Sequence, residues 1–224
     1  MTGKLIVIES GTDSSGKATQ TRKLYQRLID EGYRAKKVEF PDYDSDSSAL
    51  IKMYLGGEFG DDPADINSYA ASTFFAVDRY ASYQQKWKEF YLQGGIIVAD
   101  RYTTSNMVHQ ACKFEEREQK VEFLEWLRDL EYNRFNLPEP DCVLLLDVPP
   151  DISQKLMYKR NPPENRDIHE NDLEYLKNTY QNALWIAKKY NWKIIECTDN
   201  KNIKTVSQIH KKIYSLVKNI IYQE

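Results

Sequence analysis

The sequence predicts a three-layer α/β fold, in which helices flank a mostly parallel five-stranded sheet. The main observation is that short apolar runs rich in isoleucine and valine alternate with long helical stretches. Such runs are typical of strands that are covered on both faces. The runs expected to form the strands are residues 5–8, 35–40, 96–99, 142–147 and 193–196.

The helical stretches lie between these runs and after the last one. They are residues 17–31, 67–93, 116–133, 152–160, 173–190 and 205–221. Gly32 and the pair Gly94–Gly95 follow the first two stretches and mark helix C-terminal ends. Ligands of such sheets bind beyond the carboxyl ends of the strands. The residues that follow each apolar run are therefore the candidates for chemistry.

Composition narrows the classes of function. The chain has 224 residues, with 31 Lys and Arg against 34 Asp and Glu, and its formal net charge of −3 gives no general attraction to nucleic acid or anionic membranes. Three widely spaced cysteines exclude a disulfide framework and favour a cytoplasmic setting. No apolar run approaches the ~18–20 residues of a membrane helix, and we expect no signal peptide. Without repeats or long linkers, residues 1–224 are expected to form one domain.

A glycine-rich loop joins the first apolar run to the first helix. It matches GxxxxGK, whose backbone N–H groups, lysine and following helix N-terminus together hold phosphates. Ala18 replaces the usual Ser or Thr, which disfavours a Ras-like or motor ATPase, whereas the following Thr19 and Gln20 are typical of nucleotide kinases. The residues expected to hold ATP are Gly11, Thr12, Asp13, Ser14, Ser15, Gly16, Lys17, Ala18 and Thr19.

Four motifs spread over nearly the whole chain resemble the thymidylate kinases of the bacterial type. They are GTDSSGKATQ at residues 11–20, FPDY at 40–43, FAVDR at 75–79 and DRYTTSN at 100–106, and a weaker fifth region begins with LDV at 146–148. The first motif alone indicates only a P-loop kinase, and the next three narrow the resemblance to this family. The resemblance implies a P-loop nucleoside monophosphate kinase fold, transfer of the γ-phosphate of ATP to dTMP with Mg²⁺, and a homodimer.

The resemblance also implies how the acceptor is held. Asp13 would bond the deoxyribose 3′-hydroxyl near the metal, and Tyr43 would offer its hydroxyl to the acceptor phosphate. Phe75 and Arg79 are four residues apart and share one face of a predicted helix. The ring would stack on thymine while the guanidinium donates to its O4, an arrangement that rejects cytosine.

Asp100 and Arg101 follow the third apolar run, where two buried charges need partners. By resemblance, Arg101 binds the dTMP phosphate and Asp100 lies near Mg²⁺. Ser105, Asn106 and Gln110 would then reach the edge of the base.

A basic, proline-interrupted stretch at about residues 159–170 resembles the mobile lid of the family. Because the phosphate loop carries no arginine, the lid is expected to supply the catalytic one, and Arg160 and Arg166 are the candidates. Glu170 is a candidate ligand on the metal side, beside Asp13 and Asp100.

The expected reaction is an in-line phosphoryl transfer that needs no general base. A phosphate monoester has a second pKa near ~6, so its oxygen is already ionised at neutral pH. The remaining difficulty is repulsion between anions. Lys17, Arg101, a lid arginine and Mg²⁺ would offset it.

Two other functions stay open at this point. A deoxynucleoside or other nucleotide kinase would need a base for a hydroxyl acceptor, and Glu9 could serve. A non-catalytic nucleotide-binding switch is compatible with the unusual Ser10 and Ala18. His109 stands where the family often has an aromatic residue near the ribose, but a lone histidine is more often a packing residue. We therefore expect it to lie outside the chemistry.

Overall fold

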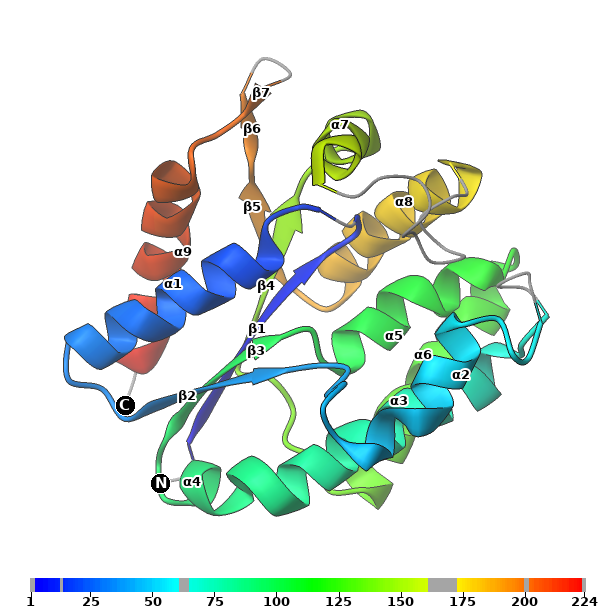
Figure 1. Cartoon of the computed structure of the whole chain (residues 1–224), viewed down its shortest axis with the longest axis horizontal. Helices are drawn as coiled ribbons and strands as arrows, with labels where there is room; N and C mark the ends of the chain where they lie inside the picture. Colours follow the sequence, from blue (N-terminus) through cyan, green and yellow to red (C-terminus); the bar gives the residue numbers. More distant parts are fainter. Residues whose placement is uncertain (1–2, 13, 61–64, 161–172, 200–201, 223–224) are drawn as a thin grey trace.

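A parallel five-stranded sheet forms the centre of the protein, seen here in a computed structural model (Figure 1). The structure describes residues 3–12, 14–60, 65–160, 173–199 and 202–222. The strands are β1 (Lys4–Ser10), β2 (Ala35–Glu39), β3 (Ile96–Asp100), β4 (Cys142–Asp147) and β5 (Lys193–Glu196), in the order β2-β3-β1-β4-β5. Every neighbouring pair is parallel, which confirms the predicted fold class.

Helices cover both faces of this sheet. They are α1 (Lys17–Asp30), α2 (Ala49–Leu55), α3 (Ser68–Ser82), α4 (Lys88–Leu92), α5 (Thr103–His109), α6 (Arg117–Arg128), α7 (Pro150–Arg160), α8 (Leu173–Lys189) and α9 (Val206–Ile221). Helices α1 and α9 pack on one face, and α4, α5, α6 and α8 pack on the other. Among the described residues, none of the helices has the length and apolarity to cross a bilayer.

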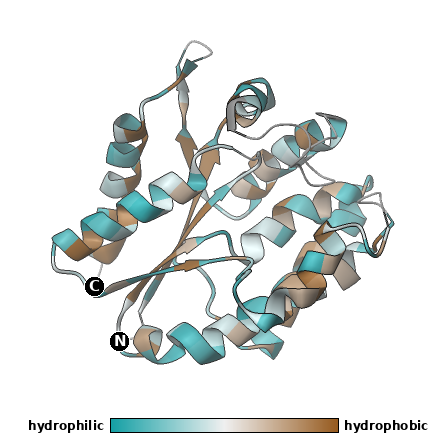
Figure 2. Ribbon diagram, in the orientation of Figure 1, coloured by the Kyte–Doolittle hydropathy of each residue, from teal (hydrophilic) through white to brown (hydrophobic). Residues whose placement is uncertain are grey.

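The three inner strands, β1, β3 and β4, are apolar on both sides because both sides are covered, whereas the edge strands β2 and β5 carry exposed lysines and glutamates. In β1, Ile6 and Ile8 pack toward α1 and α9, whereas Leu5 and Val7 pack toward the opposite layer. All four side chains are fully buried. Figure 2 shows the same pattern, with apolar residues concentrated along the strands and polar residues on the outer turns of the helices. This explains why the inner strands appear in the sequence as nearly continuous apolar runs.

Two predicted helices are interrupted. The stretch expected at residues 67–93 consists of α3, a π-helical turn η2 (Tyr83–Trp87) and α4, and the stretch at 116–133 ends in a second π-helical turn, η4 (Asp129–Arg134). Helices α2 and α5 and a short antiparallel pair, β6 (Thr198–Asp199) and β7 (Asn202–Ile203), were not predicted. Each of these helices has only 7 residues, too few to show a helical apolar period.

Candidate active site

The candidate site lies beyond the carboxyl ends of β1, β2 and β3, where the chain connections lead to opposite sides of the sheet. The phosphate loop follows β1, the FPDY motif follows β2, and the DRYTTSN motif begins at the end of β3. Parallel pairing brings these ends together. Segments that are far apart in the sequence therefore meet at one edge of the sheet.

The phosphate loop has the local geometry of an anion cradle. Gly16 has φ 89° and ends the loop at the start of α1, a left-handed conformation that favours glycine. Gly11 lies so close to α8 that an added Cβ would stand 2.8 Å from the Cβ of Ala183. The buried Nζ of Lys17 donates to Ser10 Oγ at 2.7 Å, and the buried Ser15 Oγ has no hydrogen-bond partner among the described residues. An unsatisfied hydroxyl beside a buried ammonium fits a phosphate.

A pocket at the ends of β2 and β3 is lined by seven of the eight residues predicted to bind the acceptor, namely Tyr43, Phe75, Arg79, Arg101, Ser105, Asn106 and Gln110. The eighth, Asp13, lies outside the described residues. Phe40, Pro41, Tyr54, Leu55, Tyr102 and His109 complete the lining. Phe75 packs edge-on against Tyr54 with ring centroids 6.2 Å apart, and Tyr43 is half exposed at 49%. The pocket thus combines an aromatic wall with a few polar groups, as small-molecule sites do.

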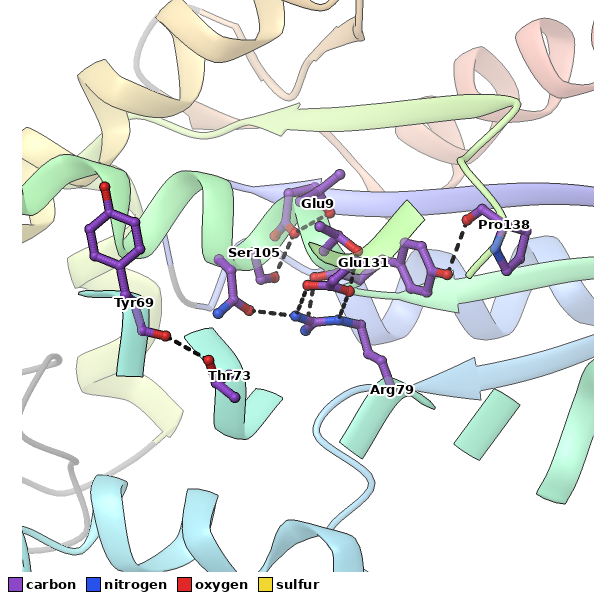
Figure 3. Close-up of polar contacts among 11 residues, drawn as sticks. Glu9, Tyr69, Thr73, Arg79, Ser105, Glu131 and Pro138 are labelled. Carbon is purple, nitrogen blue, oxygen red and sulfur yellow. Dashed lines mark hydrogen bonds and ion pairs between the residues drawn. The ribbon is translucent and has the colours of Figure 1, made fainter. Parts of the chain in front are cut away.

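Arg79 is held by an unpredicted partner, Glu131 (Figure 3). Its Nε and Nη2 donate to the two carboxylate oxygens at 2.7 and 2.5 Å. Nη2 also donates to Asn106 Oδ1 at 3.0 Å, and Nη1 makes a long contact of 3.4 Å to the carbonyl of Tyr102. Burial lowers the pKa of Arg79, but the adjacent carboxylate outweighs this effect and raises it overall. One N–H of Nη1 has no partner in the described part of the chain and remains for a ligand in the pocket.

Two buried amide atoms in the pocket also lack partners among the described residues: Asn106 Nδ2, a donor, and Gln110 Oε1, an acceptor. Their side chains are only 3% and 2% exposed. A buried polar atom without a partner is unfavourable by about 1–3 kcal/mol. Together with the Arg79 N–H, they offer two donors and one acceptor to a bound molecule.

Arg101 is held in an uncommon backbone conformation at the end of β3. Its φ is 66°, in the left-handed region, and its N–H donates to the carbonyl of Ile8 at 3.1 Å. The guanidinium Nη1 lies 3.9 Å from Glu9 Oε1 and 3.5 Å from Ser105 Oγ. Such a cost in backbone strain is typical of a residue positioned for a ligand.

Glu9 and Ser105 are bound to each other rather than aimed at a ligand. Ser105 Oγ donates to Glu9 Oε2 at 2.6 Å, and Thr104 Oγ1 donates to the same oxygen at 2.9 Å (Figure 3). The other carboxylate oxygen accepts from the backbone N–H of Ser10 at 2.9 Å. The hydroxyl proton of Ser105 is therefore donated to Glu9, and Ser105 can contact a nucleobase only as a hydrogen-bond acceptor.

His109, which the sequence analysis expected to lie outside the chemistry, lines the pocket. Its Nε2 lies 3.2 Å from Arg101 Nη1, and its Nδ1 lies 3.4 Å from the hydroxyl of Tyr175. An arginine N–H can only donate, so Nε2 accepts and the ring proton belongs on Nδ1, facing Tyr175. The Tyr175 hydroxyl then donates to the His109 carbonyl at 3.3 Å. Ser105 and His109 lie one turn apart on α5, and this spacing was the available signal.

Asp100, the last residue of β3, lies near the charges of both Lys17 and Arg101. It is buried, and burial raises its pKa, while the charges of Lys17 and Arg101 act in the opposite direction. Among the described residues, no three His, Cys, Asp or Glu side chains gather as a metal cluster. Asp13, Arg166 and Glu170 lie outside the described residues, and Arg160 is the last residue of α7. Mg²⁺ in proteins is commonly coordinated by one or two carboxylates together with substrate phosphates and waters, and the carboxylate of Asp100 fits this coordination.

Several known proteins are similar to this chain. The family model for thymidylate kinase matches residues 8–212. The human thymidylate kinase is 26% identical over 220 residues, covering 98% of this chain and 92% of that protein. A probable thymidylate kinase of Thermococcus onnurineus is 31% identical over 217 residues, covering 96% of this chain and 97% of that protein. The thymidylate kinase of Mycobacterium tuberculosis is 30% identical over 184 residues, covering 78% of this chain and 81% of that protein. A solved thymidylate kinase structure from Candida albicans superposes with a TM-score of 0.71 at 23% identity, covering 97% of this chain and 92% of that one.

Proposed function

This chain belongs to the thymidylate kinase family and phosphorylates dTMP to dTDP with ATP, and we propose how its own residues hold the two nucleotides. The observation that carries the proposal is the set of unsatisfied polar atoms in the acceptor pocket at the ends of β2 and β3. ATP would lie on residues 11–19, where Ser15 Oγ and Lys17 supply a donor and a charge. The acceptor would enter the pocket with its phosphate toward Arg101.

The base edge of thymine matches the pocket. Thymine offers an acceptor at O4, a donor at N3 and an acceptor at O2. The pocket offers the Arg79 Nη1 N–H, Gln110 Oε1 and Asn106 Nδ2 in return. Cytosine presents an amino group and a bare N3 instead, so it would leave buried groups unpaired. Phe75 would stack on the base from the side of α3.

The acceptor phosphate would be held by Arg101 and Tyr43, both of which line the pocket. The charges of Lys17 and Arg101 both lower the pKa of Asp100, so both cations lie near the same carboxylate. They would offset repulsion between the anions and the charge of the transferring group. A lid arginine, Arg160 or Arg166, would add to them.

Asp100, with Asp13 and Glu170 as further candidates, would hold Mg²⁺. When bound, the ion neutralises phosphate charge and orients the phosphate oxygens.

A general base is not required, and the geometry disfavours the alternative that needs one. Glu9 accepts from Thr104, Ser105 and the Ser10 backbone. Both carboxylate oxygens of Glu9 are already occupied by these donors, so Glu9 is poorly placed to accept a proton from a nucleoside hydroxyl.

We further propose that the protein is a homodimer that uses the outer stripe of α3. Ala70, Val77 and Tyr80 recur at helical spacing, and Val77 and Tyr80 are 44% and 41% exposed. An apolar stripe of this kind is typical of a helix that packs on a second copy. A cytoplasmic location, a single domain over residues 1–224 and membership of the bacterial type stay predictions. The relatives come from animals, archaea and bacteria.

An ADP-release assay over dTMP, dUMP, dCMP, dGMP and thymidine tests this arrangement. We expect turnover with dTMP, little with dCMP and none with thymidine. In Arg101→Ala, activity with dTMP should collapse while the thermal unfolding curve keeps its shape. Wild-type activity in that variant would remove Arg101 from the site, and equal rates for dCMP and dTMP would contradict the assigned base contacts.

A further inference from the structure

A second cationic site lies on the opposite face of the sheet from the acceptor pocket. Helices α1 and α9 run side by side there (Figure 1), and a groove of about 490 Å³ opens between them. Lys23 and Arg27 of α1 line one wall, and Lys211 and Lys218 of α9 line the other. The phosphorylation chemistry described above does not use any of these residues.

The groove is strongly positive although the chain as a whole is acidic. Four basic side chains line it and no carboxylate does, in a protein whose formal net charge is −3. Glu31, outside the lining, binds Arg27 at 2.9 Å and accepts from the Tyr214 hydroxyl. Arg27 also stacks 3.3 Å above the Tyr214 ring, which fixes its position. The four lining cations exceed this one carboxylate, and such an excess of positive charge concentrates anions.

A buried polar atom points to the missing partner. His210 of α9 lines the groove, is only 9% exposed, and its Nδ1 has no hydrogen-bond partner among the described residues. Buried polar atoms are nearly always paired, so this nitrogen calls for a ligand. Burial, followed by the charges of Lys23 and Arg27, lowers the pKa of His210. The imidazole is therefore neutral at pH 7, and an anion in the groove would raise its pKa again.

We propose that the groove between α1 and α9 binds a small ligand that carries a chain of phosphate groups. The spacing of the cations selects an extended anion over a single phosphate. Lys211 and Lys218 are seven residues apart, or about 10 Å along α9 at 1.5 Å per residue, and Lys23 and Arg27 lie one turn apart on the facing helix. A triphosphate chain can meet both walls and His210 together. Free polyphosphate and nucleoside triphosphates share this chemistry.

Histidine NMR tests the proposal because it reports on one residue. The chain has three histidines, and His210→Gln identifies the signal of His210. With inorganic tripolyphosphate at about 0.15 M salt, we expect that signal to shift in a saturable manner and its pKa to rise. In Lys23→Gln/Lys211→Gln, which changes two exposed residues, the dissociation constant should rise about tenfold or more. The matched control Lys177→Gln/Lys188→Gln removes two exposed charges from α8 and should bind as the wild type does.

Two further arms separate this site from the phosphate loop and identify the source of the phosphates. In Lys17→Ala the response of His210 should persist, whereas its loss would place the ligand in the phosphate loop and overturn the proposal. No response at millimolar tripolyphosphate, or equal weakening in the control variant, would overturn it as well. Tighter binding of dTTP than of tripolyphosphate supports a nucleotide ligand, and equal binding supports an inorganic one. The site does not depend on the acceptor assignment, so the two proposals fail independently.

Discussion

The ion pair between Arg79 and Glu131 gives the sharpest test of how the acceptor pocket is built. Both side chains are almost fully buried, at 2% and 0% exposure. Glu131→Ala would leave Arg79 as a buried charge without its carboxylate, and Thr103, which donates to Glu131 at 2.7 Å, would lose its acceptor. Breaking one partner of a buried pair costs about 3–5 kcal/mol. For a chain of this size, that loss corresponds to a fall in melting temperature of roughly 6–20 °C.

The assay is urea unfolding followed by circular dichroism, with Glu139→Ala as the matched control. Glu139 binds Arg128 at 2.5 Å, but both side chains are exposed, at 56% and 37%. Its loss should cost at most about 1 kcal/mol. The double variant Arg79→Met/Glu131→Leu should recover much of the stability, because an apolar pair can replace a buried ion pair. It should still bind dTMP poorly, because the donor to O4 is gone. Equal losses in Glu131→Ala and Glu139→Ala would refute the reasoning.

Three further predictions concern single residues of the site. His109→Phe should raise the KM for dTMP about five- to tenfold with little change in kcat, because Arg101 loses one hydrogen bond of about 1 kcal/mol. His109→Gln keeps a hydrogen-bonding side chain and should recover part of the lost affinity. An unchanged KM in His109→Phe would show that His109 only packs. Asn106→Ala should lower kcat/KM for dTMP about tenfold or more, measured by ADP release, and an equal loss with dCMP would argue against a role in base selection. Asp100 has a raised pKa in the folded state, so its contribution to stability is full below its unfolded pKa and is lost as the pH rises through the folded pKa. Asp100→Asn should therefore have a higher melting temperature than the wild type at pH 7 while losing activity. A lower melting temperature would contradict this sign.

Features that depend on consecutive residues could be predicted from the sequence. The five strands begin and end within two residues of the predicted runs. For the inner strands β1, β3 and β4 the reason is that a strand buried on both faces must be almost continuously apolar. The phosphate loop was identifiable from Gly11, Gly16 and Lys17, since its function depends on consecutive backbone groups. The remaining motifs indicated which residues would line the acceptor pocket, because parallel strands necessarily bring their carboxyl ends to one edge.

Contacts between distant segments were decided only by the tertiary structure. Glu131 is 52 residues from Arg79 in the sequence. It lies in a π-helical turn that the apolar periodicity does not predict, and this turn positions it against Arg79. His109 was dismissed as a packing residue because its neighbours in sequence do not show that Arg101, in a left-handed conformation, turns its guanidinium toward it. The groove between α1 and α9 likewise joins lysines nearly 190 residues apart. Periodicity reports which face of an element is buried, but the partner of a buried or charged side chain depends on how whole elements pack.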